Sequence, residues 1–257
     1  MSFKWWPIRR AVQLSIVALI ASPLLDLTFF RGNLASGELF TVGLADPLAF
    51  LQATVASHIF ILSFFGSALM VAVFYFIIGG RTFCGWVCPV YLLTEMGEKL
   101  RRNIGTGERT FPLSGTRWTL GMTAAITAVT GNPFFEILSP IGITSRAIMF
   151  KNWLPLLLVV AILVVEVFIA RRIWCRSLCP VGGFYSLLGR FSPFRVGYTQ
   201  HLCTHCGECT RICPVEEVLA PSLTHNNLQV TGGDCTRCGD CIDICPTKAL
   251  GVEIWYK

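Results

Sequence analysis

Cys203-Thr-His-Cys206-Gly-Glu-Cys209-Thr-Arg-Ile-Cys213-Pro214 is the stretch that decides the fold of the carboxyl-terminal part of this chain. A second copy follows it, Cys235-Thr-Arg-Cys238-Gly-Asp-Cys241-Ile-Asp-Ile-Cys245-Pro246. In both runs two, two and three residues separate the successive cysteines, and a proline follows the last one. Thiolates at this spacing are ligands of [4Fe–4S] clusters. The repeat therefore predicts two such clusters.

The spacing also predicts which cysteines share a cluster. Three cysteines spaced two residues apart wrap around one cubane, whereas the fourth faces away and binds the other cluster. We expect one cluster on Cys203, Cys206, Cys209 and Cys245, and the other on Cys235, Cys238, Cys241 and Cys213. Zinc, the main alternative, takes four ligands in a tetrahedron and fits two complete four-cysteine runs poorly. The sequence thus predicts a small α+β, two-cluster bacterial ferredoxin domain over residues 199–257.

The composition of the rest of the chain is unusually apolar. Charged residues make up 14% of the 257 residues, against about 25% in ordinary soluble domains, and the mean hydropathy is +0.61. Four apolar segments, at about residues 11–30, 57–78, 118–138 and 153–170, approach the roughly 20 residues that a membrane-spanning helix needs. The third is rich in Thr, Ala and Gly, and a re-entrant segment is an alternative for it. We expect an all-α membrane domain of about four transmembrane helices over residues 1–198.

Positive charge is distributed unevenly between the two sides of these segments. Fourteen Lys and Arg residues lie in residues 1–10, 79–117 and 171–200, whereas only Arg31, Arg146 and Lys151 lie in the intervening loops. Because Lys and Arg favour the cytoplasmic side, we expect a multi-pass protein of the bacterial inner membrane with both termini in the cytoplasm. The net charge of +6 forms no basic stripe, which argues against a nucleic-acid partner.

A second repeat lies within the apolar part of the chain. Cys84-x-x-x-Cys88-Pro and Cys175-x-x-x-Cys179-Pro each follow an apolar segment, which predicts two pseudo-symmetric helical hairpins. Cysteines four residues apart share one face of a helix, and the following prolines would end or kink it. These four cysteines could hold an extra iron or a zinc ion, cycle between dithiol and disulfide, or carry palmitate. The remaining alternative is that they are buried structural cysteines.

The paired Cys-x-x-x-Cys-Pro repeats followed by two ferredoxin runs resemble the NapH family over nearly the whole chain. These proteins are the membrane quinol dehydrogenase components of periplasmic nitrate reductase systems. The resemblance implies oxidation of a quinol, menaquinol or ubiquinol, and transfer of electrons to a NapG-like iron–sulfur protein. From there electrons would reach the periplasmic reductase through a cytochrome. The residues that the resemblance carries over are the twelve cysteines named above.

Oxidation of a quinol also requires a proton acceptor. Asp26, His58 and Glu136 lie near the expected outer ends of three apolar segments, and each could accept a hydroxyl proton. The alternative is that each is solvated at a helix end or paired with a neighbour, as we expect for Glu166. Two other functions stay open, namely an assembly factor that reduces a metal or disulfide of a partner enzyme, and a redox-sensing regulator.

Overall fold

The structure is a computed structural model, and its description covers the following residues. They are 4–22, 30–32, 36–39, 42–105, 109–134, 139–150, 154, 156–224 and 228–254. The chain forms two compact units, each built from separate stretches of sequence. The first comprises Met1–Gln13, Phe74–Val87 and Tyr185–Lys257, and the second comprises Leu14–Val73 and Cys88–Phe184. The expectation that residues 1–198 and 199–257 are separate domains stays a prediction.

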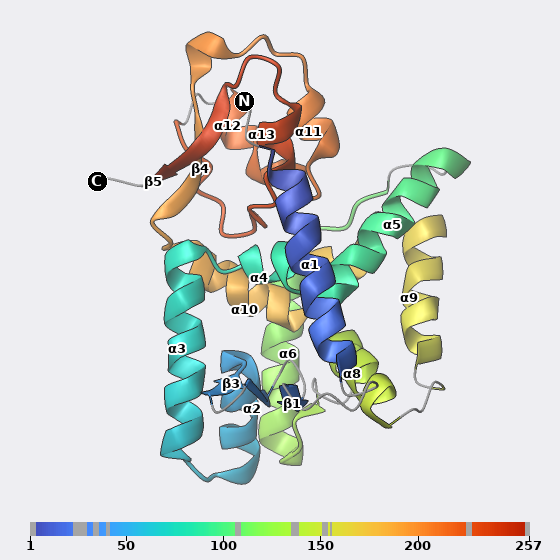
Figure 1. The fold of residues 1–257 in the computed structure, drawn as a ribbon, viewed down its shortest axis with the longest axis vertical. Coiled ribbons are helices and arrows are strands. Elements are labelled where there is room, and N and C mark those ends of the chain that lie inside the picture. Colours follow the sequence, from blue (N-terminus) through green and yellow to red (C-terminus); the bar gives the residue numbers. More distant parts are fainter. Residues whose placement is uncertain are drawn as a thin grey trace. The chain divides into compact units, whose positions relative to one another are not determined.

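Helices and strands alternate irregularly along the chain (Figure 1). The α-helices are α1 (Trp5–Ala21), α2 (Pro47–Ser57), α3 (Leu62–Ile78), α4 (Thr82–Trp86), α5 (Pro89–Ile104), α6 (Gly115–Thr130), α8 (Pro140–Phe150), α9 (Leu156–Phe168), α10 (Pro180–Gly189), α11 (Glu208–Ile212), α12 (Ala220–Thr224) and α13 (Asp240–Ile244). A π-helical turn, η2 (Trp174–Leu178), and two 3₁₀ turns, η3 (Gln200–Leu202) and η4 (Glu216–Val218), lie between them. The strands are β1 (Phe30–Gly32), β2 (Ser36–Leu39), β3 (Val42–Ala45), β4 (Phe194–Tyr198) and β5 (Leu250–Ile254).

The first unit contains the carboxyl-terminal cysteine runs. Strands β4 and β5 pair antiparallel, with Val196 opposite Val252, and close this region into one small fold. The short helices α11 and α13 pack against each other and lie side by side in Figure 1. Because each of these helices contains the third cysteine of a run, their contact brings the two runs together.

The second unit is mainly helical. Helix α5 packs against α9, and α6 packs against α2 and η2. Strands β1, β2 and β3 form an antiparallel sheet in this unit, with Gly37 opposite Leu44. The prediction that this part of the chain is all-α is therefore wrong, because the segment expected to be a loop between two helices pairs with itself.

The predicted membrane-spanning helices are not present in the described part of the chain. Helices α1 and α3 contain 17 residues each and α9 contains 13, and none of the described helices is both long and apolar enough to cross a bilayer. The expected segments are shortened by local breaks. Helix α3 begins only at Leu62, and α6 ends at Thr130, where Gly131, with φ 66°, caps the helix. The predicted four-helix membrane domain is therefore wrong, as is the multi-pass inner-membrane location that depended on it.

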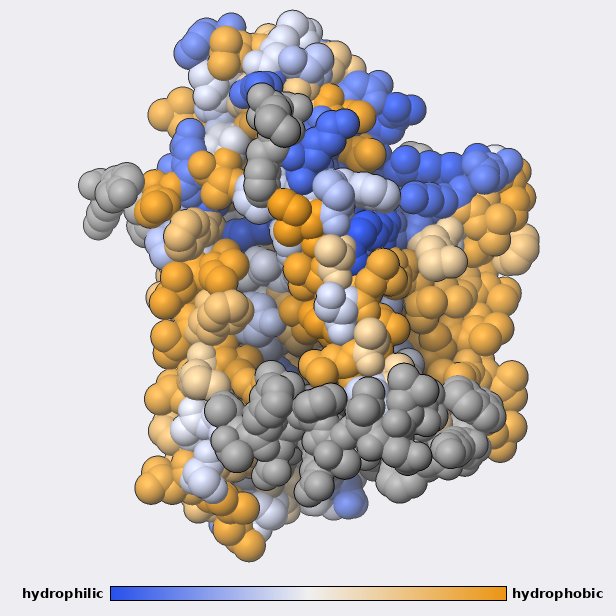
Figure 2. Space-filling view, in the orientation of Figure 1, coloured by the Kyte–Doolittle hydropathy of each residue, from blue (hydrophilic) through white to orange (hydrophobic). Residues whose placement is uncertain are grey.

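Helix α9 illustrates how the apolar residues are distributed in the second unit. Val159 and Val167 are buried, whereas Leu157, Val160 and Phe168 remain at least half exposed. Figure 2 shows this outward face of α9 as continuous hydrophobic surface. The high content of apolar residues thus lies partly on the surface of the helices and not only between them.

Candidate functional site

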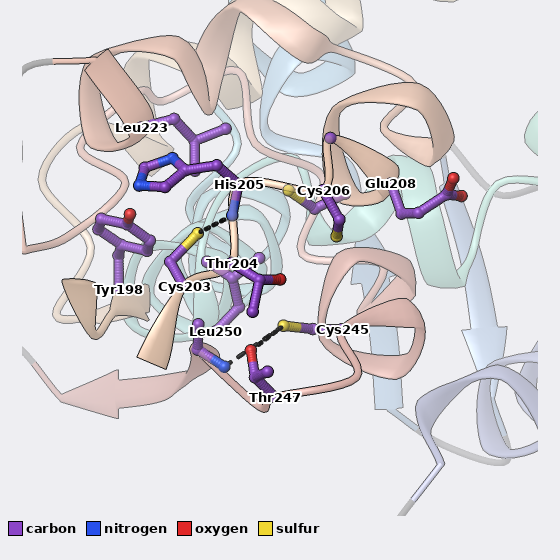
Figure 3. Close-up of a pocket in the computed structure, with 13 residues that line it drawn as sticks. Tyr198, Cys203, Thr204, His205, Cys206, Glu208, Leu223, Cys245, Thr247 and Leu250 are labelled. Carbon is purple, nitrogen blue, oxygen red and sulfur yellow. Dashed lines mark hydrogen bonds between the residues drawn. The ribbon is translucent and has the colours of Figure 1, made fainter. Parts of the chain in front are cut away.

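Four cysteines surround a cavity in the first unit. Cys203, Cys206, Cys209 and Cys245 all line a space of about 110 Å³. Figure 3 shows the sulfur atoms of Cys203, Cys206 and Cys245 around this space, although Cys245 comes from a distant part of the chain. The buried ring of Tyr198, at the end of β4, forms part of the wall.

A second cavity contains the other four cysteines of the two runs. It is smaller, about 20 Å³, and is lined by Cys213, Cys235, Cys238 and Cys241. Each cavity thus gathers three cysteines from one run and the fourth from the other run. This is the grouping expected from the spacing, while the ligation of iron by these thiols stays a prediction.

The two cysteine loops have the same backbone conformation. His205 and Arg237 occupy equivalent positions and have φ values of 54° and 49°, in the left-handed region that non-glycine residues seldom adopt. Gly207 and Gly239, with φ values of 76° and 82°, are the residues immediately before α11 and α13. These bends wrap each loop around its cavity. Figure 3 shows one result, in which the backbone N–H of His205 donates a hydrogen bond to Cys203 Sγ, at an N···S distance of 3.4 Å.

Burial controls the protonation of several of these thiols. Burial raises the pKa of the Cys238 thiol to about 12, and the nearby Asp240 carboxylate adds to this effect. The pKa of Cys241 is also raised, by burial and by the neighbouring cysteines. For Cys245, N–H donors, above all that of Ala249, outweigh burial and lower the pKa. Because iron binds the thiolate form, loading of the buried thiols must release protons.

The number of thiols around each cavity fits a [4Fe–4S] cluster. In the described part of the chain, no three Cys, His, Asp or Glu side chains are grouped closely enough for one metal ion. The cysteines instead stand around cavities, four to each. A cubane has four iron corners that each take one thiolate, so the number and kind of donors in each cavity match a [4Fe–4S] cluster.

Two arginines that sequence analysis missed support the second cysteine loop. Arg9 Nη1 is buried and donates to the main-chain oxygen of Cys238 at 3.3 Å and to Asp240 Oδ2 at 2.9 Å. Arg81 Nη1 is likewise buried and donates to Asp234 Oδ1 at 3.1 Å. Both arginines lie more than 150 positions from their partners. A signal for Arg81 does exist in the sequence, since it lies three residues before Cys84, as Arg172 lies three residues before Cys175.

The Cys-x-x-x-Cys-Pro pairs do not lie on continuous α-helices. Cys84 lies within α4, but Cys88 has an extended backbone and immediately precedes α5. Cys175 lies in the π-turn η2, and Cys179 is the residue that ends it. Pro89 is the first residue of α5, as Pro180 is of α10, because proline suits the first position of a helix. The expectation that each proline ends or kinks the helix of its cysteines therefore misses that a new helix begins there.

The predicted proton acceptors are placed only in part. Asp26 and Glu136 lie outside the described residues. His58 is exposed and caps α2 in the left-handed conformation, with φ 55°. Glu166 is buried in α9, where its Oε1 accepts a hydrogen bond of 3.3 Å from the N–H of Trp174, and burial raises its pKa to about 7. Of these four residues, the structure therefore describes only His58 and Glu166.

Comparisons with known proteins place both cysteine repeats in iron–sulfur families. A family described as a 4Fe-4S binding domain matches residues 58–107 and 152–199, each of which contains one Cys-x-x-x-Cys-Pro pair. A family described as a 4Fe-4S dicluster domain matches residues 195–246, which contain the two ferredoxin runs. No solved structure matches the chain. The iron–sulfur character of the chain is thus supported independently of its cavities.

Several characterised proteins resemble the chain over most of its length. The methylamine utilization ferredoxin-type protein MauN of Paracoccus denitrificans is 36% identical over 224 residues, covering 86% of this chain and 79% of the relative. The ferredoxin-type protein NapH of Escherichia coli is 31% identical over 239 residues, covering 91% of this chain and 83% of the relative. NapH of Haemophilus influenzae is 32% identical over 226 residues, covering 86% and 78% respectively. The chain therefore belongs to the NapH-like family of ferredoxin-type electron-transport proteins with [4Fe–4S] domains.

Proposed function

We propose that this chain takes electrons from a quinol and passes them through two [4Fe–4S] clusters to a partner iron–sulfur protein. The observation that carries the proposal is the presence of two neighbouring cavities, each lined by four cysteines. The family membership supports an electron-transport role. The resemblance to NapH proteins supports the quinol as donor and a NapG-like protein, leading to a nitrate-type reductase, as acceptor.

The residues of the chain would hold the clusters in a fixed arrangement. Cys203, Cys206, Cys209 and Cys245 would bind one cluster, and Cys213, Cys235, Cys238 and Cys241 the other. A bound [4Fe–4S] cluster supplies reversible uptake of one electron. Oxidation of one quinol releases two electrons and two protons, so two such acceptors match the electrons of one quinol. The contact between α11 and α13 supports transfer between them, because both cavities adjoin these helices.

The two protons of the quinol require acceptors in the chain or in water. We keep Asp26, His58 and Glu136 as candidates from the sequence. Cys84, Cys88, Cys175 and Cys179 are candidates for an extra iron or dithiol centre. The match of a 4Fe-4S binding family across both pairs supports iron at this group.

Anaerobic reduction by a short-chain quinol tests the proposed function. The iron-loaded protein is mixed with the quinol and its purified partner iron–sulfur protein, and reduced clusters are detected by EPR. We expect reduced-cluster signals in both proteins, with dithionite as the positive control for this chain. If dithionite reduces the clusters but the quinol never does, even with the partner present, quinol is not the donor.

A further inference from the structure

A third cavity in the first unit contains no cysteine. Its volume is about 420 Å³, within the roughly 300–1,000 Å³ typical of small-molecule sites. Apolar and aromatic residues dominate its wall, including Trp5, Phe74, Tyr75, Trp86 and Ile242. The rings of Trp5 and Trp86 meet edge to face, with centroids 6.1 Å apart at 87°. Such a wall suits a flat apolar ligand, because aromatic rings pack well against other rings.

This aromatic cavity directly adjoins the second cysteine-lined cavity. Val196, Arg237 and Gly239 line both of them. Arg237 and Gly239 also flank Cys238 in the sequence, so the cysteine loop itself forms the shared wall. A ligand in the aromatic cavity would therefore lie one layer of residues away from the predicted cluster, which suits an electron donor or acceptor.

Arg237 is one of the polar residues, beside Thr82 and Arg195, in this mainly apolar wall. Its Nε donates to the main-chain oxygen of Phe194 at 2.9 Å, and Nη2 donates to that of Gly189 at 3.4 Å. Its Nη1 is buried and has no hydrogen-bond partner within the described residues. The guanidinium packs against Gly79, whose φ of 119° and bare Cα leave the space that it fills. A buried donor without an acceptor is costly, and a ligand oxygen would relieve this cost.

We propose that this cavity binds the ring of a quinone or quinol, with a ring oxygen accepting a hydrogen bond from Arg237 Nη1. The inference rests on the proposed function and gives it a location. A quinone ring meets three requirements at once, since it is flat, largely apolar and carries oxygen acceptors. An acyl chain fits the apolar wall but offers no acceptor to the guanidinium. The assignment competes with the sequence-based site at Asp26, His58 and Glu136.

Photolabelling of the full iron-loaded protein tests this location. The probe is an azido-benzoquinone with a short alkyl tail, and labelled peptides are mapped by mass spectrometry. We expect label within Trp5–Gln13, Phe74–Val87 or residues 194–196 and 237–252, and competition by the unmodified quinone. Label confined to peptides that contain Asp26, His58 or Glu136 would overturn the assignment. Equal competition by an alkane of similar length would also overturn it, because the occupant would then be an acyl chain.

Matched variants measure the contribution of the cavity wall. Trp5→Leu and Arg237→Gln should each weaken binding of the unlabelled quinone about tenfold, the change that roughly 1.4 kcal/mol produces. Trp6→Leu is the control, because Trp6 is on the same helix but does not line the cavity. Arg237→Lys should recover part of the affinity lost in Arg237→Gln. Unchanged affinity in both Trp5→Leu and Arg237→Gln, or equal loss in the control, would refute the site.

Labelling and reduction measured on the same samples distinguish failure of this site from failure of the proposed function. Each variant is first reduced with dithionite, and its EPR signals establish that both clusters are intact. Reduction by quinol together with labelling elsewhere would leave the function standing and remove the site. Labelling of the cavity without reduction by quinol would support the site as a quinone-binding site but remove the proposed electron donor. If quinol neither reduces the clusters nor labels the cavity, both proposals fail.

Discussion

Glu98 in α5 has a negative charge that three neighbouring arginines stabilise. It is buried, and its carboxylate forms ion pairs with the guanidinium groups of Arg102, Arg171 and Arg172. The N···O distance is 2.6 Å in each pair. Burial alone would raise its pKa, but Arg172 and Arg171 outweigh that effect and lower the pKa to about 2. The guanidinium of Arg172 also lies 4.6 Å from the ring centroid of Tyr91. Glu98 therefore joins α5 to the segment that follows α9.

Replacement of Glu98 by Gln should destabilise the protein strongly at pH 7. Two buried guanidinium groups would lose their carboxylate, and breaking a buried ion pair in this way costs about 3–5 kcal/mol. The control is Glu208→Gln, because Glu208 pairs with Arg211 at the same 2.6 Å but on the surface, where the cost is below about 1 kcal/mol. Thermal unfolding under anaerobic conditions measures the loss of stability in each of the two variants. Equal effects of the two substitutions would contradict this explanation.

The pH dependence of the Glu98 contribution has a definite sign. The folded pKa of about 2 lies below the ordinary value of 4.5, so the stabilisation is complete above pH 4.5 and is lost as pH falls toward 2. The difference in stability between the natural protein and Glu98→Gln should therefore shrink through this window. A difference that stays constant from pH 7 down to the lowest pH at which the fold persists would show that Glu98 acts by packing alone.

Cys245 tests the exchange of the fourth cysteine between the two runs. Cys245→Ser should disturb the cluster on Cys203, Cys206 and Cys209, and iron content should fall from about eight toward about four per chain. Cys84→Ser is the control for the two clusters, whose Mössbauer signals it should leave intact, since Cys84 lies in α4 and lines neither cysteine cavity. Iron analysis with Mössbauer spectroscopy measures the change. Full retention of two intact clusters in Cys245→Ser would remove Cys245 from the ligands.

At the scale of elements, the amino-terminal helix supports the loop before α13. Arg9 of α1 bonds both Cys238 and Asp240, while the backbone N–H groups of Trp5 and Trp6 donate to Asp243 at 2.9 and 2.8 Å. One helix thus holds the end of this loop and the helix α13 that follows it. Its positive charge also lies close to the predicted cluster, where it favours the reduced and more negative state.

Arg9→Gln should lower the reduction potential of one cluster. Loss of a buried positive charge, which also leaves Asp240 without this partner, makes addition of an electron less favourable by an amount on the order of tens of millivolts. An EPR-monitored redox titration measures this shift. Arg10→Gln is the matched control, because Arg10 on the same helix donates to Gln13. An equal shift in both variants, or none in Arg9→Gln, would show that the contact of Arg9 with the loop does not tune the cluster.

At the scale of the whole molecule, the sequence best predicted the features that depend on residues close together in the chain. The cysteine spacing predicts the two groups of four that line the cavities, because a cubane imposes its geometry on a short loop. Helix length was predicted less well, since hydropathy does not reveal where α3 begins or α6 ends. The sheet of β1, β2 and β3 was missed because its strands are only three or four residues long.

Contacts between distant parts of the chain could not be predicted from one sequence. In the sequence, Arg9 is one of the positive charges of residues 1–10, whereas in the structure it bonds a loop 229 residues away. The aromatic cavity could not be predicted for the same reason, because its wall combines residues of α1, α3, α4 and the carboxyl-terminal strands. The spacing of residues along the sequence carries no sign that Trp5, Trp86 and Arg237 meet.

The most direct test of the central claim is the iron and acid-labile sulfide content of protein purified without oxygen. Two [4Fe–4S] clusters require about eight iron atoms and eight sulfides per chain. More than eight iron atoms would add a centre at Cys84, Cys88, Cys175 and Cys179 while leaving the two clusters in place. A colourless protein, or one that contains zinc and no labile sulfide, would contradict the account.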